Sequence, residues 1–376
     1  AAVFTTMTFM PASTAEADDG LGFSVAIDGD TLAAGAPWED RGRSLDATSA
    51  KDSGAVYVFT RQGGQWAEQA YLKPEMPIAG EFFGTSVALL GNVMAVGAGV
   101  NDPIVTSPNV TLNGAVYLFA RTGTTWTQTG RLVAWDMNAG DVFGYNLLLT
   151  PDLLVVGAPF ESTGATRSGA VYLFARRGAG WDKQSKLKAM QPVADAAFGA
   201  ALAIDASTLV IGAFSDSTLG TNIGAAHVFV QQSGAWTEQQ RLLPAKASAG
   251  ATFGWSVAVS GDTILVGAPH WVPEFVQTTS GEAYVFTRSG GTWSQTDVLA
   301  ATVPRASDSF GASLVLTPTL LIVGAYGDSS GSQGFQGDPN DASLSGSGAF
   351  YLYARQPSHF ALTTYVKTSK PRSRDA

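Results

Sequence analysis

The sequence predicts an all-β fold, a β-propeller of four-stranded antiparallel blades, with six blades favoured and seven as the alternative. Three observations predict it. A four-part pattern recurs along the chain, each part has the composition of a strand, and glycine (43 of 376 residues) separates the parts. Many short strands joined by turn-forming residues at regular intervals are typical of such folds.

The first repeated part is a Phe-Gly pair followed by a short apolar run, as in residues 83–88. Its glycines fall at 22, 84, 144, 199, 254 and 311, at intervals of 55 to 62 residues. The first copy is degenerate, because Leu21 takes the place of the phenylalanine. Self-similarity at a fixed period indicates a repeat architecture, and each copy predicts the first strand of one blade.

Three further parts complete each unit. About 13 residues later comes Gly-Ala-Pro or a close variant, starting at 35, 97, 157, 212, 267 and 324. The third part resembles residues 54–59 and is apolar on both faces, so it must be covered on both sides. The fourth is a tryptophan followed six residues later by an aliphatic residue, as in Trp66 and Leu72. Side chains alternate along a strand, which predicts that this pair points to one face.

Six such units, each with four strands buried on both faces, favour a propeller over a solenoid, whose repeats are usually shorter and whose ends need polar caps. We therefore expect one propeller domain over residues 1–366. Residues 367–376 are expected to form a solvated basic tail that contains Lys367, Lys370, Arg372 and Arg374.

Composition excludes several classes of protein. Charged residues are 14% and apolar residues 45%, which argues against intrinsic disorder. No apolar run is long enough for a membrane-spanning helix, and a net charge of −9 argues against nucleic-acid binding. Cysteine is absent, which excludes disulfides and thiolate sites. The small residues at the start are compatible with a mature end left after signal cleavage.

The Phe-Gly and Gly-Ala-Pro parts resemble the FG-GAP repeat, known from the β-propeller of integrin α-subunits and from bacterial exported proteins. The resemblance covers about residues 20–355, with six copies in phase. It implies a secreted or cell-surface propeller, here expected to be bacterial, that is used for binding or adhesion. It implies no particular ligand.

The chain departs from integrin-type propellers, which have seven blades. The first three parts occur six times, whereas the outer strand occurs seven times, counting residues 4–10 and Phe360–Val366. A six-bladed ring leaves one of these two segments spare. A spare edge strand is predicted to pair with a neighbouring chain or a larger assembly, unless both segments lie within one closed blade.

Metal and cofactor signals are weak. The calcium loops of the resembled family lie between the first two strands, where this chain has only short turns such as residues 28–30, so they are not carried over. Asp338, Asn340 and Asp341 cluster in one loop, but three oxygen-bearing residues are fewer than calcium prefers. We expect no cofactor, and calcium at this loop stays an open alternative.

Signals for catalysis are also poor, so we expect no enzyme. The chain contains three histidines, of which His227 takes the place of a repeated tyrosine and is expected to be packed. No nucleophile elbow or zinc-protease motif is present. Carboxylate pairs are plentiful, so a glycan-active hydrolase or lyase stays an alternative.

The residues that depart from the repeat are the candidates for binding. The connections after the second strand and before the first strand of each blade share one end of the blades, and long loops on a rigid scaffold often carry function. Exposed aromatic rings beside carboxylates are typical of protein or sugar binding, although aromatic rings can also merely cap the blades. The predicted ligand-binding residues are Trp38, Glu39, Asp40, Tyr145, Phe160, Glu161, Trp255, His270 and Trp271. The predicted function is recognition of a protein or glycan, with a structural role in an assembly as the alternative.

Overall fold

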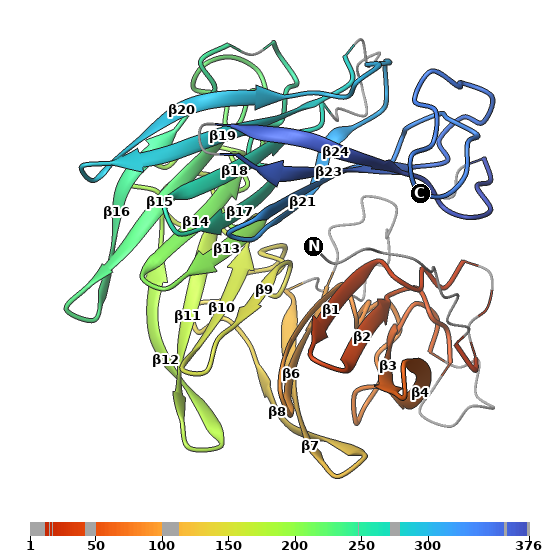
Figure 1. The fold of residues 1–376 in the computed structure, drawn as a ribbon. Helices are drawn as coiled ribbons and strands as arrows, with labels where there is room; N and C mark the ends of the chain where they lie inside the picture. Colours follow the sequence, from red (N-terminus) through yellow and green to blue (C-terminus); the bar gives the residue numbers. More distant parts are fainter. Residues whose placement is uncertain are drawn as a thin grey trace. The chain divides into compact units, whose positions relative to one another are not determined.

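The computed structural model describes residues 12–14, 16, 18–41, 50–99, 113–246, 248–270, 279–356 and 359–373. Over these residues the chain forms strands and no helix, and the strands make six four-stranded antiparallel sheets (Figure 1). Each sheet uses four strands that are consecutive in the sequence. The predicted fold class, an all-β propeller with six blades, is confirmed.

The chain divides into two compact units, Thr8–Lys188 and a second unit that contains Ala189–Ala376. The first unit holds blade 1, of β1 (Ser24–Asp28), β2 (Thr31–Ala36), β3 (Ala55–Gln62) and β4 (Gln65–Leu72). Blade 2 has β5 (Ser86–Leu90), β6 (Val93–Ala98), β7 (Ala115–Thr122) and β8 (Thr125–Leu132). Blade 3 has β9 (Leu147–Leu149), β10 (Leu153–Ala158), β11 (Ala170–Arg177) and β12 (Gly180–Leu187).

The second unit holds blades 4 to 6. Blade 4 has β13 (Ala201–Asp205), β14 (Thr208–Ala213), β15 (Ala225–Gln232) and β16 (Ala235–Leu242). Blade 5 has β17 (Ser256–Ser260), β18 (Thr263–Ala268), β19 (Glu282–Ser289) and β20 (Thr292–Leu299). Blade 6 has β21 (Phe310–Leu316), β22 (Leu320–Ala325), β23 (Ala349–Arg355) and β24 (Phe360–Val366).

The middle of the third strand is buried on both faces in each blade, as its composition predicts. In β3 the five residues 55–59 are at most 3% exposed. Val56 and Val58 on one face of β3 pack with Val96 and Tyr117 of blade 2, in a core cluster between the two blades. Burial of apolar surface between neighbouring blades is therefore the main force that holds each unit together.

Glycine in the two anchors is explained by the close approach of neighbouring blades. A Cβ atom added to Gly97, in the Gly-Ala part of blade 2, would lie 2.1 Å from the carbonyl oxygen of Gly144, in the Phe-Gly part of blade 3. Gly144 itself has a φ of +95°, which L-residues rarely adopt. Gly97 is thus required by the close contact between blades, and Gly144 by its backbone conformation.

The prediction that Trp66 and Leu72 point to one face is wrong. Every pairing of a third with a fourth strand contains a register shift, which in blade 1 falls between Val58 and Phe59. This β-bulge adds one residue to β4, so Trp66 lies opposite Arg61 whereas Leu72 lies opposite Val56, on the other face. Leu72 accordingly packs in the core between blades 1 and 2, and Trp66 packs in the cluster that contains Tyr57.

The arginines that recur near the end of the third strand stabilise the blades. Arg61 donates through Nε to Asp30 in the turn between β1 and β2 (2.8 Å), and its guanidinium lies over the ring of Trp66. Arg288 makes the equivalent contacts with Asp262 and Trp293 in blade 5. These contacts give the arginines a structural role within their blades.

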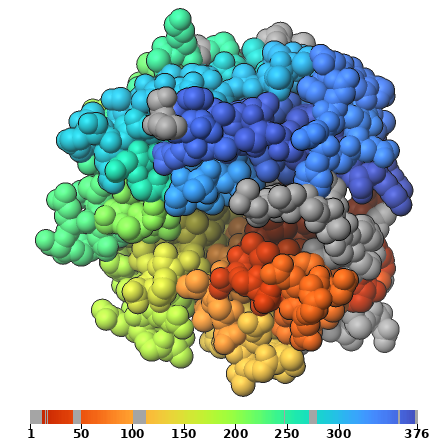
Figure 2. Space-filling model, in the orientation of Figure 1, coloured from red at the N-terminus to blue at the C-terminus, as the bar shows by residue number. Residues whose placement is uncertain are grey.

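The C-terminal strand and the residue after it have defined places. β24 is the fourth strand of blade 6, whereas residues 4–10, the other terminal strand of the prediction, lie outside the described residues. Lys367, expected in a solvated tail, is instead fully buried and ion-paired with Asp328. Asp328 lies in the long connection between β22 and β23, whose surface appears in blue in Figure 2. This pairing could not be predicted from the sequence, because Asp328 and Lys367 are 39 positions apart.

Candidate binding site

A buried ion pair recurs at the blade end where the second strand leads into the third. The carboxylate follows the Gly-Ala part, and the lysine follows the fourth strand. The pairs are Glu39 with Lys73 in blade 1, Glu161 with Lys188 in blade 3, and Asp328 with Lys367 in blade 6. The three carboxylate residues are at most 1% exposed. We call this place the corner of the blade.

A serine completes each of these three corners. It precedes the glycine at the start of the third strand, and its Oγ accepts a hydrogen bond from the lysine Nζ. The distances are 2.8 Å for Ser53, 3.1 Å for Ser168 and 2.7 Å for Ser347. A buried charge is tolerated only when it is paired and hydrogen-bonded, and the serine and carboxylate together meet this requirement for the lysine.

The electrostatics differ between corners. In blade 3, burial by itself would raise the pKa of Glu161, but hydrogen bonds from Lys188, Thr163 and Lys186 outweigh burial and lower it. In blade 1, burial lowers the pKa of Lys73, and the neighbouring Glu39 opposes this only in part. The predicted binding residues Glu39 and Glu161 are thus engaged in ion pairs inside their blades.

Blade 4 has a variant of the corner. Asp216 is 2% exposed and pairs with Arg241, which also donates to Thr218 Oγ1. Arg241 lies within β16, two residues before the position that lysine occupies in blades 1, 3 and 6. The corner therefore keeps a cation and a carboxylate even where the serine is replaced by Ile223.

Blade 5 departs from this arrangement. The strand register places Ala300 at the position of the lysine, and Trp271, at the position of the carboxylate, lies outside the described residues. Ser280 is retained before Gly281. Glu282 comes next, where the other five blades have alanine (Ala55, Ala115, Ala170, Ala225 and Ala349).

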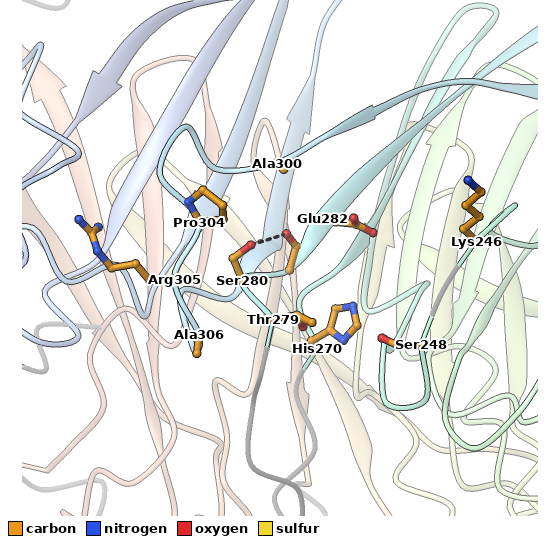
Figure 3. A pocket seen from close by; sticks show the side chains of 11 residues that line it. Lys246, Ser248, His270, Thr279, Ser280, Glu282, Ala300, Pro304, Arg305 and Ala306 are labelled. Atoms are coloured by element: carbon orange, nitrogen blue, oxygen red, sulfur yellow. Dashed lines mark hydrogen bonds between the residues drawn. The ribbon is translucent and has the colours of Figure 1, made fainter.

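A pocket of about 660 Å³ lies at the corner of blade 5. Its walls include Ala300, Ser280, Glu282 and His270, with Lys246, Ser248, Thr279, Gly281, Pro304, Arg305 and Ala306. In Figure 3, Ser280 and Glu282 lie between Ala300 on one side and His270 on the other. The volume is within the range of about 300–1,000 Å³ that is typical of ligand pockets.

Two ionisable side chains of this pocket interact with each other. Burial lowers the pKa of His270, and the charge of nearby Glu282 opposes that shift. Tyr284, on β19, donates its hydroxyl toward Glu282 Oε2 and fixes the position of the carboxylate. Only the candidate His270 came from the sequence prediction. Glu282 was missed, although its departure from the repeated alanine was a readable signal.

The two cations of the pocket wall are directed elsewhere. Arg305 donates through Nη2 to the carbonyl oxygens of Pro339 and Asn340, both at 2.9 Å. In Figure 3 its side chain extends away from Ser280 and Glu282, and the ammonium of Lys246 points away from His270. Glu282 is the carboxylate among the residues of the pocket wall.

Predicted aromatic residues form ring pairs at the same end of their blades. In the first unit, Trp38 packs edge-on against Phe23 (5.0 Å between ring centroids), and Tyr145 against Phe160 (6.4 Å). Arg167 lies 4.6 Å above the Phe160 ring. Phe23 was missed because it belongs to the degenerate first copy of the repeat.

Among its described residues the second unit has one such pair at this end. Trp255, predicted from the sequence, lies 5.0 Å from Phe214, which takes the place of the repeated proline. Both side chains are partly exposed. Of the remaining candidates, Asp40 accepts a hydrogen bond from the backbone N–H of Asp52 (2.8 Å), and Trp271 lies outside the described residues.

The loop with Asp338, Asn340 and Asp341 uses its carboxylates in turns. Asp338 Oδ1 accepts from the backbone N–H (2.9 Å) and side-chain amide (3.0 Å) of Asn340, and Asp341 Oδ1 accepts from the N–H of Ser343 (2.9 Å). Within the described ranges no group of three or more His, Cys, Asp or Glu side chains could hold a metal ion. Calcium at this loop stays an untested prediction.

The fold and the repeated corners define the class of protein as a repeat β-propeller. A family model of the FG-GAP repeat matches residues 6–59, 66–119, 126–174, 181–229 and 236–286. The chain therefore belongs to the FG-GAP repeat family. A comparison with curated proteins finds no match. None of the described residues forms a helix that is long and apolar enough to cross a membrane.

Proposed function

We propose that this protein is a non-enzymatic binding propeller that works outside the cell or on its surface. Its partner is a protein or a glycan, held by the connections that lead into the first and third strands of the blades. The family supports this proposal, because FG-GAP propellers are typical of extracellular binding and adhesion proteins.

One observation carries the choice of these connections. Aromatic rings pair there in three places, at Trp38, Phe160 and Trp255, each with a neighbouring ring. The carboxylates beside two of them, Glu39 and Glu161, are used in buried ion pairs. Partly exposed rings are thus the groups that remain for a partner, and flat rings provide apolar contact area at a low entropic cost.

The test is a binding screen with matched variants. The full chain is applied to a glycan array and to a panel of purified cell-surface and matrix proteins, and each signal is measured again with Trp38→Ala, Phe160→Ala and Trp255→Ala. We expect at least one of these variants to lose tenfold or more in affinity while keeping its melting temperature, since buried aromatic anchors often contribute 2 kcal/mol or more, roughly thirtyfold.

Trp66→Ala is the control. Trp66 is the second residue of β4 and lies at the opposite end of the blade from Trp38. Its replacement should therefore leave binding unchanged. A partner that binds all three corner variants as well as the wild type would refute the choice of surface. Turnover of a polysaccharide, lost on replacing a single carboxylate, would favour the hydrolase or lyase instead.

A further inference from the structure

We propose that the corner of blade 5 binds an alkylammonium group of the partner, such as the end of a lysine side chain, in the place where three other blades hold a lysine of their own. This inference deepens the proposed function and rests on it. It names the chemistry of one subsite.

The first step of the argument is the position of Ala300. In blades 1, 3 and 6 the residue after the fourth strand is a lysine whose Nζ contacts a serine and a carboxylate. The register of β19 with β20 puts Ala300 in that position. Blade 5 therefore has the backbone of the corner without the side chain that fills it.

The second step is that the serine of the corner persists and a second hydroxyl lies next to it. Ser280 occupies the position of Ser347, and its Oγ makes only a long hydrogen bond (3.4 Å) to the carbonyl oxygen of Gly281. Thr279 Oγ1 is buried beside it and has no hydrogen-bond partner. Both hydroxyl oxygens can accept from an ammonium, which carries three donors.

The third step concerns the carboxylate. Glu282 reaches the corner from a different backbone position, yet it meets the hydroxyl of Tyr284 on the third strand. In blade 6 the hydroxyl of the equivalent Tyr351 lies 3.4 Å from Asp328 Oδ2. Asp328 is the residue that binds Lys367. Both carboxylates thus lie within reach of the equivalent tyrosine hydroxyl of their blades.

Blade 2 shows that loss of the lysine does not by itself create this combination. Val133 takes the lysine position there, but Asn113 replaces the serine and Ala115 stays alanine. In blade 5 the loss is accompanied by a new carboxylate and a retained serine. An acidic group facing an open pocket of about 660 Å³ is suited to a cation that comes from outside.

The shape of the pocket favours an alkylammonium over a guanidinium. Ala300, Pro304 and Ala306 provide apolar wall for a methylene stem. The acceptors are two hydroxyls and one carboxylate, which suit a compact ammonium with three donors better than the planar fork of arginine.

The first experiment restores the missing lysine within the chain. Ala300→Lys is made in the wild type and in the Glu282→Gln variant, and thermal unfolding of all four proteins is followed. We expect Ala300→Lys to raise the melting temperature by about 1–2 °C when Glu282 is present, and to give no gain with Glu282→Gln. Equal effects in the two backgrounds overturn the proposal.

The second experiment uses an external probe. Binding of Nα-acetyl-L-lysine N-methylamide to the full chain is measured by ligand-observed NMR, with the Nε-acetylated compound and the norleucine analogue as neutral controls. We expect the charged probe alone to bind, and Glu282→Gln and Ala300→Lys each to weaken it at least tenfold, the second by filling the corner. Val133→Lys, at the same position of blade 2, is the matched control and should leave binding unchanged.

The outcomes separate this inference from the proposed function. Equal binding of the neutral compounds, no binding of the charged probe, or unchanged binding by Ala300→Lys overturns the ammonium subsite. If a partner still depends on Trp255, the proposed function stands in each of these cases. If the probe binds as expected while no partner depends on the aromatic rings, the subsite stands and the proposed surface fails.

Discussion

The corners of blades 5 and 6 share one backbone plan and differ in their contents. In blade 6, Lys367 is fully buried between Asp328 and Ser347, whereas in blade 5 the equivalent residue is Ala300 and a pocket opens beside Ser280. The difference teaches that a repeat can acquire a pocket by losing a structural side chain, while the serine of the corner is retained and a new carboxylate, Glu282, joins it.

The largest expected effect is on the filled corner. Lys367→Met leaves Asp328 buried without a cation, and removing one partner of a buried pair typically costs about 3–5 kcal/mol of unfolding free energy. Denaturant unfolding measures this loss. Lys370→Met, on an exposed residue three positions later, is the control and should change stability by less than about 0.5 kcal/mol. Similar stabilities of the two variants would contradict the structural role of Lys367.

A smaller effect concerns pH. Burial raises the pKa of Asp308 to about 6, and nearby Asp328 adds to the shift, whereas Arg305 and Lys367 oppose it. The folded state therefore holds this proton more tightly than the unfolded state, so the stabilisation is present at low pH and is lost as the pH rises through about 6. At pH 8 the ionised carboxylate costs about 3 kcal/mol of unfolding free energy.

Asp308→Asn should remove this cost. We expect the variant to gain stability over the wild type at pH 8 and to keep only about half of that gain at pH 5, where the carboxyl of the unfolded chain is still ionised, as measured by unfolding at both values. Asp182→Asn, on a side chain that is 69% exposed, serves as the control. A gain that is the same at pH 5 and pH 8 would show that ionisation of Asp308 is not the cause.

The smallest effect compares the two serines. Ser347 Oγ is buried, accepts from Lys367 and donates to the carbonyl oxygen of Ser330 (2.7 Å), so Ser347→Ala should cost about 1–2 kcal/mol. Ser280→Ala in blade 5 should cost less than about 0.5 kcal/mol, because no lysine depends on it. Unfolding midpoints of the two variants test the difference, and equal losses would mean that the two corners are not as different as the contacts indicate.

Much of the fold could be predicted from the sequence because the repeat occurs six times. Phe-Gly, Gly-Ala-Pro and the doubly apolar third strand each recur in phase, and blade number follows from counting them. The bulge between the third and fourth strands could not be predicted, because the alternation of side chains along a strand does not show where one extra residue is inserted. The bulge puts Trp66 and Leu72 on opposite faces of the blade, whereas the sequence predicted one face for both.

The candidate site was predicted only in part. Trp38, Tyr145, Phe160 and Trp255 were found as departures from the repeat, and each lies beside another ring. The use of Glu39 in a buried ion pair was not found, because its partner is 34 residues away. Glu282 was within reach of the sequence, since alanine takes its position in five other copies.

The sequence by itself determined the repeat, the strand order within each blade and the residue types at each corner, since these depend on local patterns that recur. Only the tertiary structure decided that the corner of blade 6 is filled and that a pocket lies at the corner of blade 5. That outcome depends on side chains from distant parts of the chain meeting in one place, and a lysine that fills a corner in one blade is an alanine in another with no change in the local strand pattern.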